Sequence, residues 1–126
     1  RLELLQPKIL ELIELPLEKL STKKGTSAVY QLRFPKIGRY ELVFRMSSAL
    51  GERAQLPISV FLNNTLQQTV TLNGTEGQIL ERVVTLPIRQ DGEKYMKLYF
   101  GESGIDMHRM FLRYAGQNDI ESFRNE

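Results

Sequence analysis

Three side chains that can carry charge or exchange protons lie within four residues of the chain: Asp106, His108 and Arg109. A carboxylate, an imidazole and a guanidinium in contact would suit general acid–base catalysis. Side chains alternate along an extended strand, however, so we expect His108 to face away from Arg109, on the side of Met110. The sequence has no second histidine, no cysteine and no Gly-x-Ser-x-Gly motif to complete a nucleophilic site. We therefore interpret His108 as a structural residue and predict that the chain is not an enzyme.

Two polar loops hold most of the candidates for ligand binding. The loop SSALGERAQ, residues 47–55, carries hydroxyls and a charged pair, and the corner GESGID, residues 101–106, carries two carboxylates. Binding residues concentrate on loops of this kind. Carboxylates on such loops are expected to be solvated rather than arranged as a glycosidase pair. We predict that ligand binding involves Ser47, Ser48, Glu52, Arg53, Glu102 and Asp106.

Tyr95 and Tyr99 share a strand with Met96, Leu98 and Phe100 but lie on its opposite face. The period of two places the apolar residues in a core and the tyrosines outside it. Two exposed rings can form a platform for a ligand, or the N-terminal segment can cover them, and the sequence leaves both open. We include Tyr99 among the predicted ligand-binding residues.

Apolar side chains at every second position predict the strands that hold these residues. Asn63-Asn64 predicts a two-residue turn, because Asn tolerates positive φ. We expect the first two runs to pair as a hairpin and residues 95–114 to form a closing hairpin. The predicted strands are residues 27–34, 40–46, 58–62, 65–72, 80–86, 95–100 and 108–114.

Residues 1–20 are ambiguous. Leu2, Leu5 and Ile9 follow a helical spacing, yet Pro7 and Pro16 interrupt it. We interpret residues 8–15 and 17–22 as short edge strands, where proline at an end is tolerated. Residues 21–26 are polar around a glycine and predict a surface turn.

Short runs separated by Gly, Asn and Pro turns at about ten-residue intervals are typical of two packed antiparallel sheets. We predict an all-β fold, an antiparallel β-sandwich with about eight strands in two sheets. Residues 1–26 would add N-terminal strands and a loop, residues 27–114 the core, and residues 115–126 a tail or linker. The bulk of the core is expected from Tyr30, Tyr40, Phe44, Phe100 and Phe111.

Composition narrows the function further. A chain of 126 residues suits one domain, and 17 basic against 15 acidic residues leave a net charge of only +2. The basic residues are scattered, which argues against nucleic acid as a partner, and no apolar run is long enough for a membrane span. The absence of cysteine excludes disulfides and thiolate metal sites. Because the chain begins with Arg1, we expect a processed product or a piece of a longer protein.

The order of these motifs resembles the carbohydrate-binding modules of families 6 and 35, within the galactose-binding-domain-like group, which implies a β-sandwich of the jelly-roll type. The resemblance covers residues 27–114. One strand ends at Phe34, the turn to the next holds Gly38 and Tyr40, and that strand has Arg45 near its end. ISVFLNN (58–64) corresponds to the family's Val-x-Val-Asn-Gly strand, residues 92–98 to its late Gly-x₅-Leu strand, and residues 104–107 to its terminal Gly-x-Asp strand.

The resemblance implies a non-catalytic accessory module that binds a polysaccharide or oligosaccharide. Its partners would include other domains of the same, glycan-degrading parent chain, and its location would be secreted, periplasmic or on a bacterial surface. Family members commonly present Trp or Tyr to the sugar just after the position of Arg45, whereas this chain has Met46 there and no Trp at all. The alternative is a structural or protein-interaction module that braces a neighbouring domain and binds no sugar.

The resemblance also implies a structural calcium ion, with Asp106 in the place of the late ligand. The acidic pair that would complete the site is not reproduced by Glu3, Glu11 and Glu14. Calcium takes six to eight oxygen ligands, so one matching carboxylate is a small part of a site. Asp106 can instead cap the Gly-rich corner by accepting hydrogen bonds from backbone amides, and the sequence favours this role.

Overall fold

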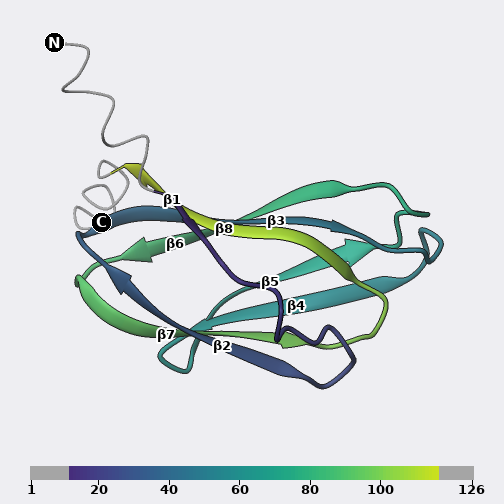
Figure 1. The fold of residues 1–126 in the computed structure, drawn as a ribbon, viewed down its shortest axis with the longest axis horizontal. Coiled ribbons are helices and arrows are strands. Elements are labelled where there is room, and N and C mark those ends of the chain that lie inside the picture. Colours follow the sequence, from purple (N-terminus) through teal and green to yellow (C-terminus); the bar gives the residue numbers. More distant parts are fainter. Residues whose placement is uncertain (1–11, 117–126) are drawn as a thin grey trace, which may run out of the picture.

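The computed structural model describes residues 12–116, which form two four-stranded sheets packed face to face (Figure 1). One sheet has the strand order β1-β8-β3-β6 and the other β2-β7-β4-β5, and every neighbouring pair is antiparallel. The predicted all-β sandwich of eight strands is thereby confirmed. The strands are β1 (Leu12–Glu14), β2 (Ser27–Phe34), β3 (Gly38–Ser47), β4 (Gln55–Leu62), β5 (Thr65–Asn73), β6 (Leu80–Ile88), β7 (Gly92–Phe100) and β8 (Asp106–Gly116).

The core lies between the two sheets and is built from the alternating apolar sets. Tyr40, Leu42, Phe44 and Met46 of β3 are all buried, as are Met96, Leu98 and Phe100 of β7. Phe34 and Tyr40 meet edge to face with ring centroids 5.0 Å apart, the geometry that aromatic quadrupoles favour. Burial of each large side chain stabilises the fold by roughly 1.5–3 kcal/mol.

The predicted hairpin of residues 27–34 and 40–46 is wrong. β2 pairs with β7, whereas β3 pairs with β6 and β8 in the other sheet. Pro35 ends β2, and residues 35–37 carry the chain from one sheet to the other (Figure 1). Two strands can each bury one face in either of two arrangements: side by side in one sheet, or facing each other across the core. Alternation alone does not distinguish these arrangements.

The closing hairpin predicted for residues 95–114 is also wrong, for the same reason. β7 and β8 belong to different sheets, and the corner at residues 101–105 crosses between them. Ile105 is buried in the core, and the backbone N–H of Gly101 donates to the carbonyl of Pro57 at 3.0 Å. These contacts turn the corner inward over the end of the sandwich.

A β-bulge changes the expected orientation of His108. Arg45 pairs with Arg109 and Met46 pairs with Met107, so β8 contributes an extra residue at this point. Met107 therefore packs against the core, while His108 is exposed and does not continue the buried face of Met110. The prediction that His108 shares that face is corrected by the bulge.

Phe111 is buried, but not between the sheets. It lies on the outer face of β8, where the guanidinium carbons of Arg109 and Arg113 lie 4.2 and 5.8 Å from its ring centroid. Cations over an aromatic ring are attracted to its electron-rich face and also cover it from water. The expectation that Phe111 contributes to the central core is wrong.

The N-terminal expectations have a mixed outcome. Of residues 8–15, residues 8–11 lie outside the described part, and Leu12–Glu14 forms β1 as predicted. Residues 17–22 are not a strand: the backbone turns, with the Leu20 N–H donating to the Leu17 carbonyl at 3.0 Å, and both leucines pack against the core. Pro16 has no N–H for a ladder, which favours this turn.

The predicted turns are confirmed at both positions that the sequence identified. Asn63 and Asn64 have φ of 47° and 69° between the paired residues Leu62 and Thr65, as a type I′ hairpin requires. The Thr26 N–H donates to the Lys23 carbonyl in the predicted surface turn. β8 continues to Gly116, and the rest of the predicted tail lies outside the described residues. Within residues 12–116 no helix has the length and hydrophobicity needed to cross a membrane.

An ion pair at the edge of one sheet predicts acid sensitivity of β1. Arg109 Nε donates to Glu14 Oε2 at 2.8 Å, and this bond lowers the pKa of the Glu14 carboxyl. A lowered folded-state pKa contributes stability that is present at neutral pH and is lost as the pH falls through that pKa. We expect hydrogen-exchange protection of the Leu15 amide, which donates to Met110 next to β1, to decrease between about pH 5 and pH 3.

The control for this prediction is Glu14→Gln, which removes the titrating group but keeps the side-chain length. Protection of Leu15 should then be lower at pH 6, after correction for intrinsic exchange, and nearly independent of acid. Glu102→Gln, which removes the Lys24–Glu102 pair between the segments before β2 and after β7, should retain the acid dependence. An unchanged acid dependence in Glu14→Gln would contradict the assignment.

Candidate functional site

Four loops meet at one end of the sandwich, which we call the loop end: residues 21–26, 48–54, 74–79 and 101–105. The second and third are bound together by backbone hydrogen bonds, from Gly77 N–H to the Ser48 carbonyl (2.8 Å) and from Glu76 N–H to the Leu50 carbonyl (3.0 Å). The Thr75 hydroxyl adds two bonds to the backbone of Ser48. The two loops therefore form one rigid unit.

The first and fourth loops are joined in the same way. Lys24 N–H donates to the Ser103 hydroxyl at 2.8 Å, and the Lys24 ammonium lies 3.6 Å from the Glu102 carboxylate. The Thr22 hydroxyl donates to the Ile105 carbonyl at 2.7 Å. Six of the seven predicted site residues lie at the loop end as a result: Ser47, Ser48, Glu52, Arg53, Glu102 and Asp106.

The two serines are occupied by structural contacts. Ser48 is completely buried, and its hydroxyl accepts a hydrogen bond from the Leu50 amide at 3.1 Å. The Ser47 hydroxyl lies 2.7 Å from His108 Nε2. This Ser–His contact has the distance of a nucleophile and its base, but no carboxylate among the described residues bonds the imidazole, so the orienting third group is lacking. The pair ties β3 to β8 and supports the interpretation of His108 as structural.

The charged candidates at the loop end are exposed, except for Glu102, which is partly buried. Glu52 and Arg53 lie at the tip of the β3–β4 loop, and Asp106 is the first residue of β8. The Asp106 carboxylate has no hydrogen-bond partner within residues 12–116, so the prediction that it caps the Gly-rich corner is wrong. The same range holds no group of three His, Cys, Asp or Glu side chains placed to bind a metal. Calcium binding at Asp106 stays a prediction, and a site there would draw its other ligands from carbonyls or water.

The seventh predicted residue, Tyr99, lies on a different surface. The outer face of the β2-β7-β4-β5 sheet carries Tyr95 and Tyr99, which are 56% and 40% exposed, and we call it the tyrosine face. Ser27 and Ser59 flank Tyr99 on the neighbouring strands, and Gln31 lies opposite Tyr95. The described N-terminal residues do not cover either ring.

The middle of the tyrosine face is partly apolar. Lys97 lies between the tyrosines along β7, and its ammonium sits 4.7 Å from the ring centroid of Phe61. Val29 is opposite Lys97 on β2 and is exposed. Tyr95 and Tyr99 are four positions apart along β7, which places them about 13 Å from each other. Two separated rings with hydroxyl, amide and amine groups around them suit a long ligand with apolar faces and polar edges.

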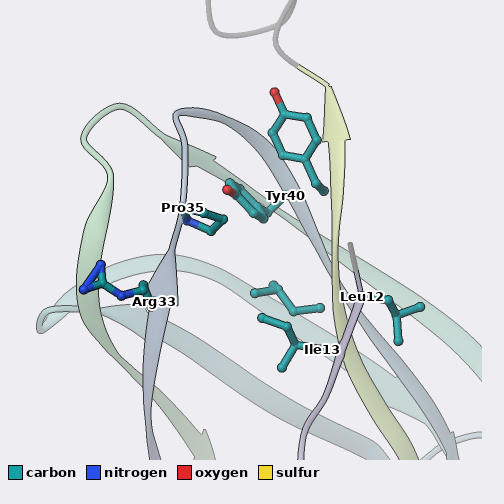
Figure 2. A pocket seen from close by; sticks show the side chains of 7 residues that line it. Leu12, Ile13, Arg33, Pro35 and Tyr40 are labelled. Carbon is teal, nitrogen blue, oxygen red and sulfur yellow. The ribbon is translucent and has the colours of Figure 1, made fainter. Parts of the chain in front are cut away.

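A hollow of about 280 Å³ lies toward the opposite end of the sandwich (Figure 2). Pro35 and Tyr40 form one side and Leu12 and Ile13 of β1 the other, with Arg33 at the rim (Figure 2). Its hydroxyls are already engaged, since Tyr40 donates to the Lys36 carbonyl at 2.7 Å and Tyr114 donates to the Ile37 carbonyl at 3.3 Å. The hollow is therefore mainly apolar. The sequence does not predict this hollow, because its residues come from distant strands and alternation does not predict which strands lie side by side.

Comparison with known proteins identifies a relative in sequence and several relatives in fold. No family model matches the chain. The chain is 27% identical over 94 residues to a β-glucosidase of Ruminococcus albus, and the match covers 75% of this chain and 10% of that enzyme. The chain therefore spans about a tenth of this curated relative.

Solved structures define the class of fold. A family 35 carbohydrate-binding module from Clostridium thermocellum superposes with a TM-score of 0.62 at 13% identity, covering 83% of this chain and 89% of that module. A family 6 module from Cellvibrio mixtus lichenase 5A, in complex with cellotriose, superposes with a TM-score of 0.57 at 15% identity, covering 74% and 73%. The chain has the fold of a carbohydrate-binding module. More particularly, it is the fold of families 6 and 35, as the sequence resemblance predicted.

Proposed function

We propose that this chain is a non-catalytic carbohydrate-binding module that holds a polysaccharide or oligosaccharide on the tyrosine face. The observation that carries the proposal is the exposure of Tyr95 and Tyr99 on one sheet face, with Ser27, Gln31 and Ser59 beside them. The Gln31 amide donates to Glu93 and the Ser59 hydroxyl bonds the Thr69 hydroxyl, but an amide and a hydroxyl each have further donor and acceptor capacity for a ligand. The apolar face of a sugar ring stacks on an aromatic ring, while its hydroxyls need partners nearby. In this proposal the two tyrosines provide the aromatic platform for the sugar, since the chain has no tryptophan.

The spacing of the rings favours a chain of sugars over a single one. Two tyrosine rings about 13 Å apart cannot both stack on the same sugar ring. In this proposal the module keeps a longer, glycan-degrading protein on its substrate outside the cell, in a secreted, periplasmic or surface-bound form. The 10% coverage of the Ruminococcus albus β-glucosidase supports a place beside further domains.

Affinity electrophoresis tests the proposal. We expect hydroxyethyl cellulose, xylan or galactomannan in the gel to retard the protein. Tyr95→Ala and Tyr99→Ala should each weaken the affinity about tenfold, as loss of an aromatic anchor does. The double variant should migrate as it does in a gel without polysaccharide. Ile79→Ala, which removes an equally exposed apolar side chain at the loop end, should leave retardation unchanged.

A second pair of variants distinguishes the tyrosine face from the loop end. If Glu52→Ala and Glu102→Ala abolish retardation while both tyrosine variants bind normally, the sugar site lies at the loop end and our placement is wrong. If the unmodified protein is retarded by none of the polysaccharides, sugar binding itself is wrong.

The second candidate function is a module that braces a neighbouring domain without binding sugar. Leu12 and Ile13 favour it, because both are 42% exposed and both line the apolar hollow of Figure 2. Exposed apolar side chains around a hollow are typical of contact surfaces between domains. Absence of glycan retardation would favour this function.

A further inference from the structure

A second hollow, which we call the edge groove, lies beside β2. It has a volume of about 510 Å³, within the range of small-molecule sites. One wall is the segment 16–20 and the other is the beginning of β2. The lining residues are Pro16, Glu18, Lys19, Leu20, Ser27, Ala28, Val29 and Tyr30.

The walls of the edge groove are fixed by hydrogen bonds. The Tyr30 hydroxyl donates to the Pro16 carbonyl at 2.8 Å, which joins the two walls. The Leu15 amide donates to Met110, and the Thr26 hydroxyl donates to the Ser21 carbonyl at 2.8 Å, so the segment is anchored on both sides of the groove. A ligand would meet a preformed site and would not have to order it.

Polar groups converge on the groove from both walls. Glu18 and Lys19 are exposed and supply an acceptor and a donor from the loop wall, and Ser27 supplies a hydroxyl from the strand wall. β2 is the edge strand of its sheet, so its free side also presents backbone N–H and C=O groups. Leu20 and Val29 add apolar surface. This combination matches the mixed hydroxyl and C–H surface of a sugar.

The edge groove is continuous with the tyrosine face. Ser27 and Val29 line the groove and also point to the outer face of the sheet, where Ser27 pairs with Tyr99 and Val29 with Lys97. A glycan stacked on Tyr99 would therefore reach the groove by crossing a single strand, about 5 Å.

The short extent of the groove favours a sugar over an added peptide strand. The groove borders β2 only at Ser27–Tyr30, about 13 Å of strand, and the bond from Tyr30 to Pro16 lies at one end of this part. An added β-strand would run along the whole free edge of β2 to Phe34, outside the groove, whereas one sugar ring fits within it.

We propose that the edge groove is a second subsite of the module, which holds one sugar residue of the same glycan that stacks on the tyrosine face. This inference rests on the proposed function. Glu18 accepts hydrogen bonds from two sugar hydroxyls, Lys19 and the Ser27 hydroxyl provide donors, and Val29 contacts the ring. The groove makes the module select chains long enough to reach from Tyr95 across Tyr99 and over β2.

Calorimetric titration of the full chain with cellohexaose, xylohexaose and mannohexaose tests the subsite. The variant Glu18→Gln/Lys19→Ala should bind the recognised hexaose about tenfold more weakly than the unmodified protein, because it loses charge-assisted hydrogen bonds. Glu81→Gln/Arg82→Ala is the matched control: it removes an adjacent acid and base from the other sheet, and its affinity should stay within about twofold.

Amide chemical shifts provide an independent measurement. Addition of the recognised hexaose should shift the amides of Leu20 and Ala28 as well as those of Tyr95 and Tyr99. If Glu18→Gln/Lys19→Ala binds as tightly as the unmodified protein, or if only the tyrosine amides shift, the edge groove is not a subsite although the proposed function stands. If no hexaose and no polysaccharide binds, both proposals are overturned.

Discussion

Replacement of Phe100 with alanine is expected to lower the free energy of unfolding by about 4 kcal/mol, the usual cost of deleting a buried phenylalanine. The Phe100 side chain is completely buried on the inner face of β7, and the residue pairs with Ile58 on β4. The surrounding strands are held in two hydrogen-bonded sheets and can collapse only partly into the space left by the ring. Since small domains are stable by roughly 5–15 kcal/mol, this single change removes a large part of the total.

Phe61→Ala is the matched control for Phe100→Ala. Phe61 lies on the outer face of β4 and contacts the Lys97 ammonium, so its loss should cost about 1 kcal/mol. Urea unfolding followed by tyrosine fluorescence measures both variants, with unchanged m-values as the sign of two-state behaviour. Equal destabilisation by the two substitutions would contradict the assignment of Phe100 to the core.

Alternation predicted the strands of this fold well because burial in a sandwich is decided one residue at a time. Every second residue of β3 from Tyr40 to Met46 faces the core, and all four are buried as the pattern requires. The turn at Asn63 and Asn64 followed from the same local chemistry, the tolerance of Asn for positive φ. Features that depend on one or two neighbouring residues were therefore predictable.

Apart from the β4–β5 pair joined by the Asn63-Asn64 turn, strand pairing was not predictable, because alternation identifies a buried face but not the strand beside it. Both predicted hairpins failed where the chain passes from one sheet to the other, after Phe34 and after Phe100. The orientation of His108 failed for a related reason, since the bulge is visible only in the register between β3 and β8. Phe111 is buried by arginine side chains on its own strand, two residues before and two residues after it.

The residues of the candidate site likewise include some whose position the sequence predicted and others whose position it did not. The place of Tyr99 on the outer face followed directly from the period of β7, whereas its exposure did not, because the sequence left open whether the N-terminal segment covers the ring. The burial of Ser48 did not follow from its place on a polar loop, because it results from the contact of that loop with Thr75, 27 residues further on. The edge groove likewise requires Pro16–Leu20 to turn beside β2, which the broken pattern of the N-terminal segment could not specify.

The proposed function assigns different roles to the loop end and the tyrosine face. At the loop end, hydrogen bonds and the Lys24–Glu102 ion pair hold four loops together. The tyrosine face keeps its aromatic rings exposed on a sheet that is already rigid. A rigid surface loses little conformational entropy when it binds, which favours the face as the binding surface and the loop end as its support.

Gly74→Ala is expected to destabilise the loop end more than any other substitution of one small residue. A Cβ at position 74 would overlap the backbone carbonyl oxygens of Gly51 and Leu50, and backbone atoms cannot rotate away as a flexible side chain can. Gly74 is also buried, and its N–H donates to the Ala54 carbonyl at 3.2 Å. We expect a loss of about 3 kcal/mol in the free energy of unfolding and a decrease of about 10 °C in Tm.

Gly51→Ala provides the matched control, because Gly51 lies on the opposite side of the same contact and has open space where its Cβ would be. Its stability should stay within about 0.5 kcal/mol of the unmodified protein. Scanning calorimetry of the two variants tests the contact, and a Gly74→Ala protein as stable as Gly51→Ala would contradict it. Affinity electrophoresis at a temperature where both are folded then separates support from binding. Gly74→Ala should still be retarded if the sugar lies on the tyrosine face, whereas loss of retardation in the folded variant would return the site to the loop end.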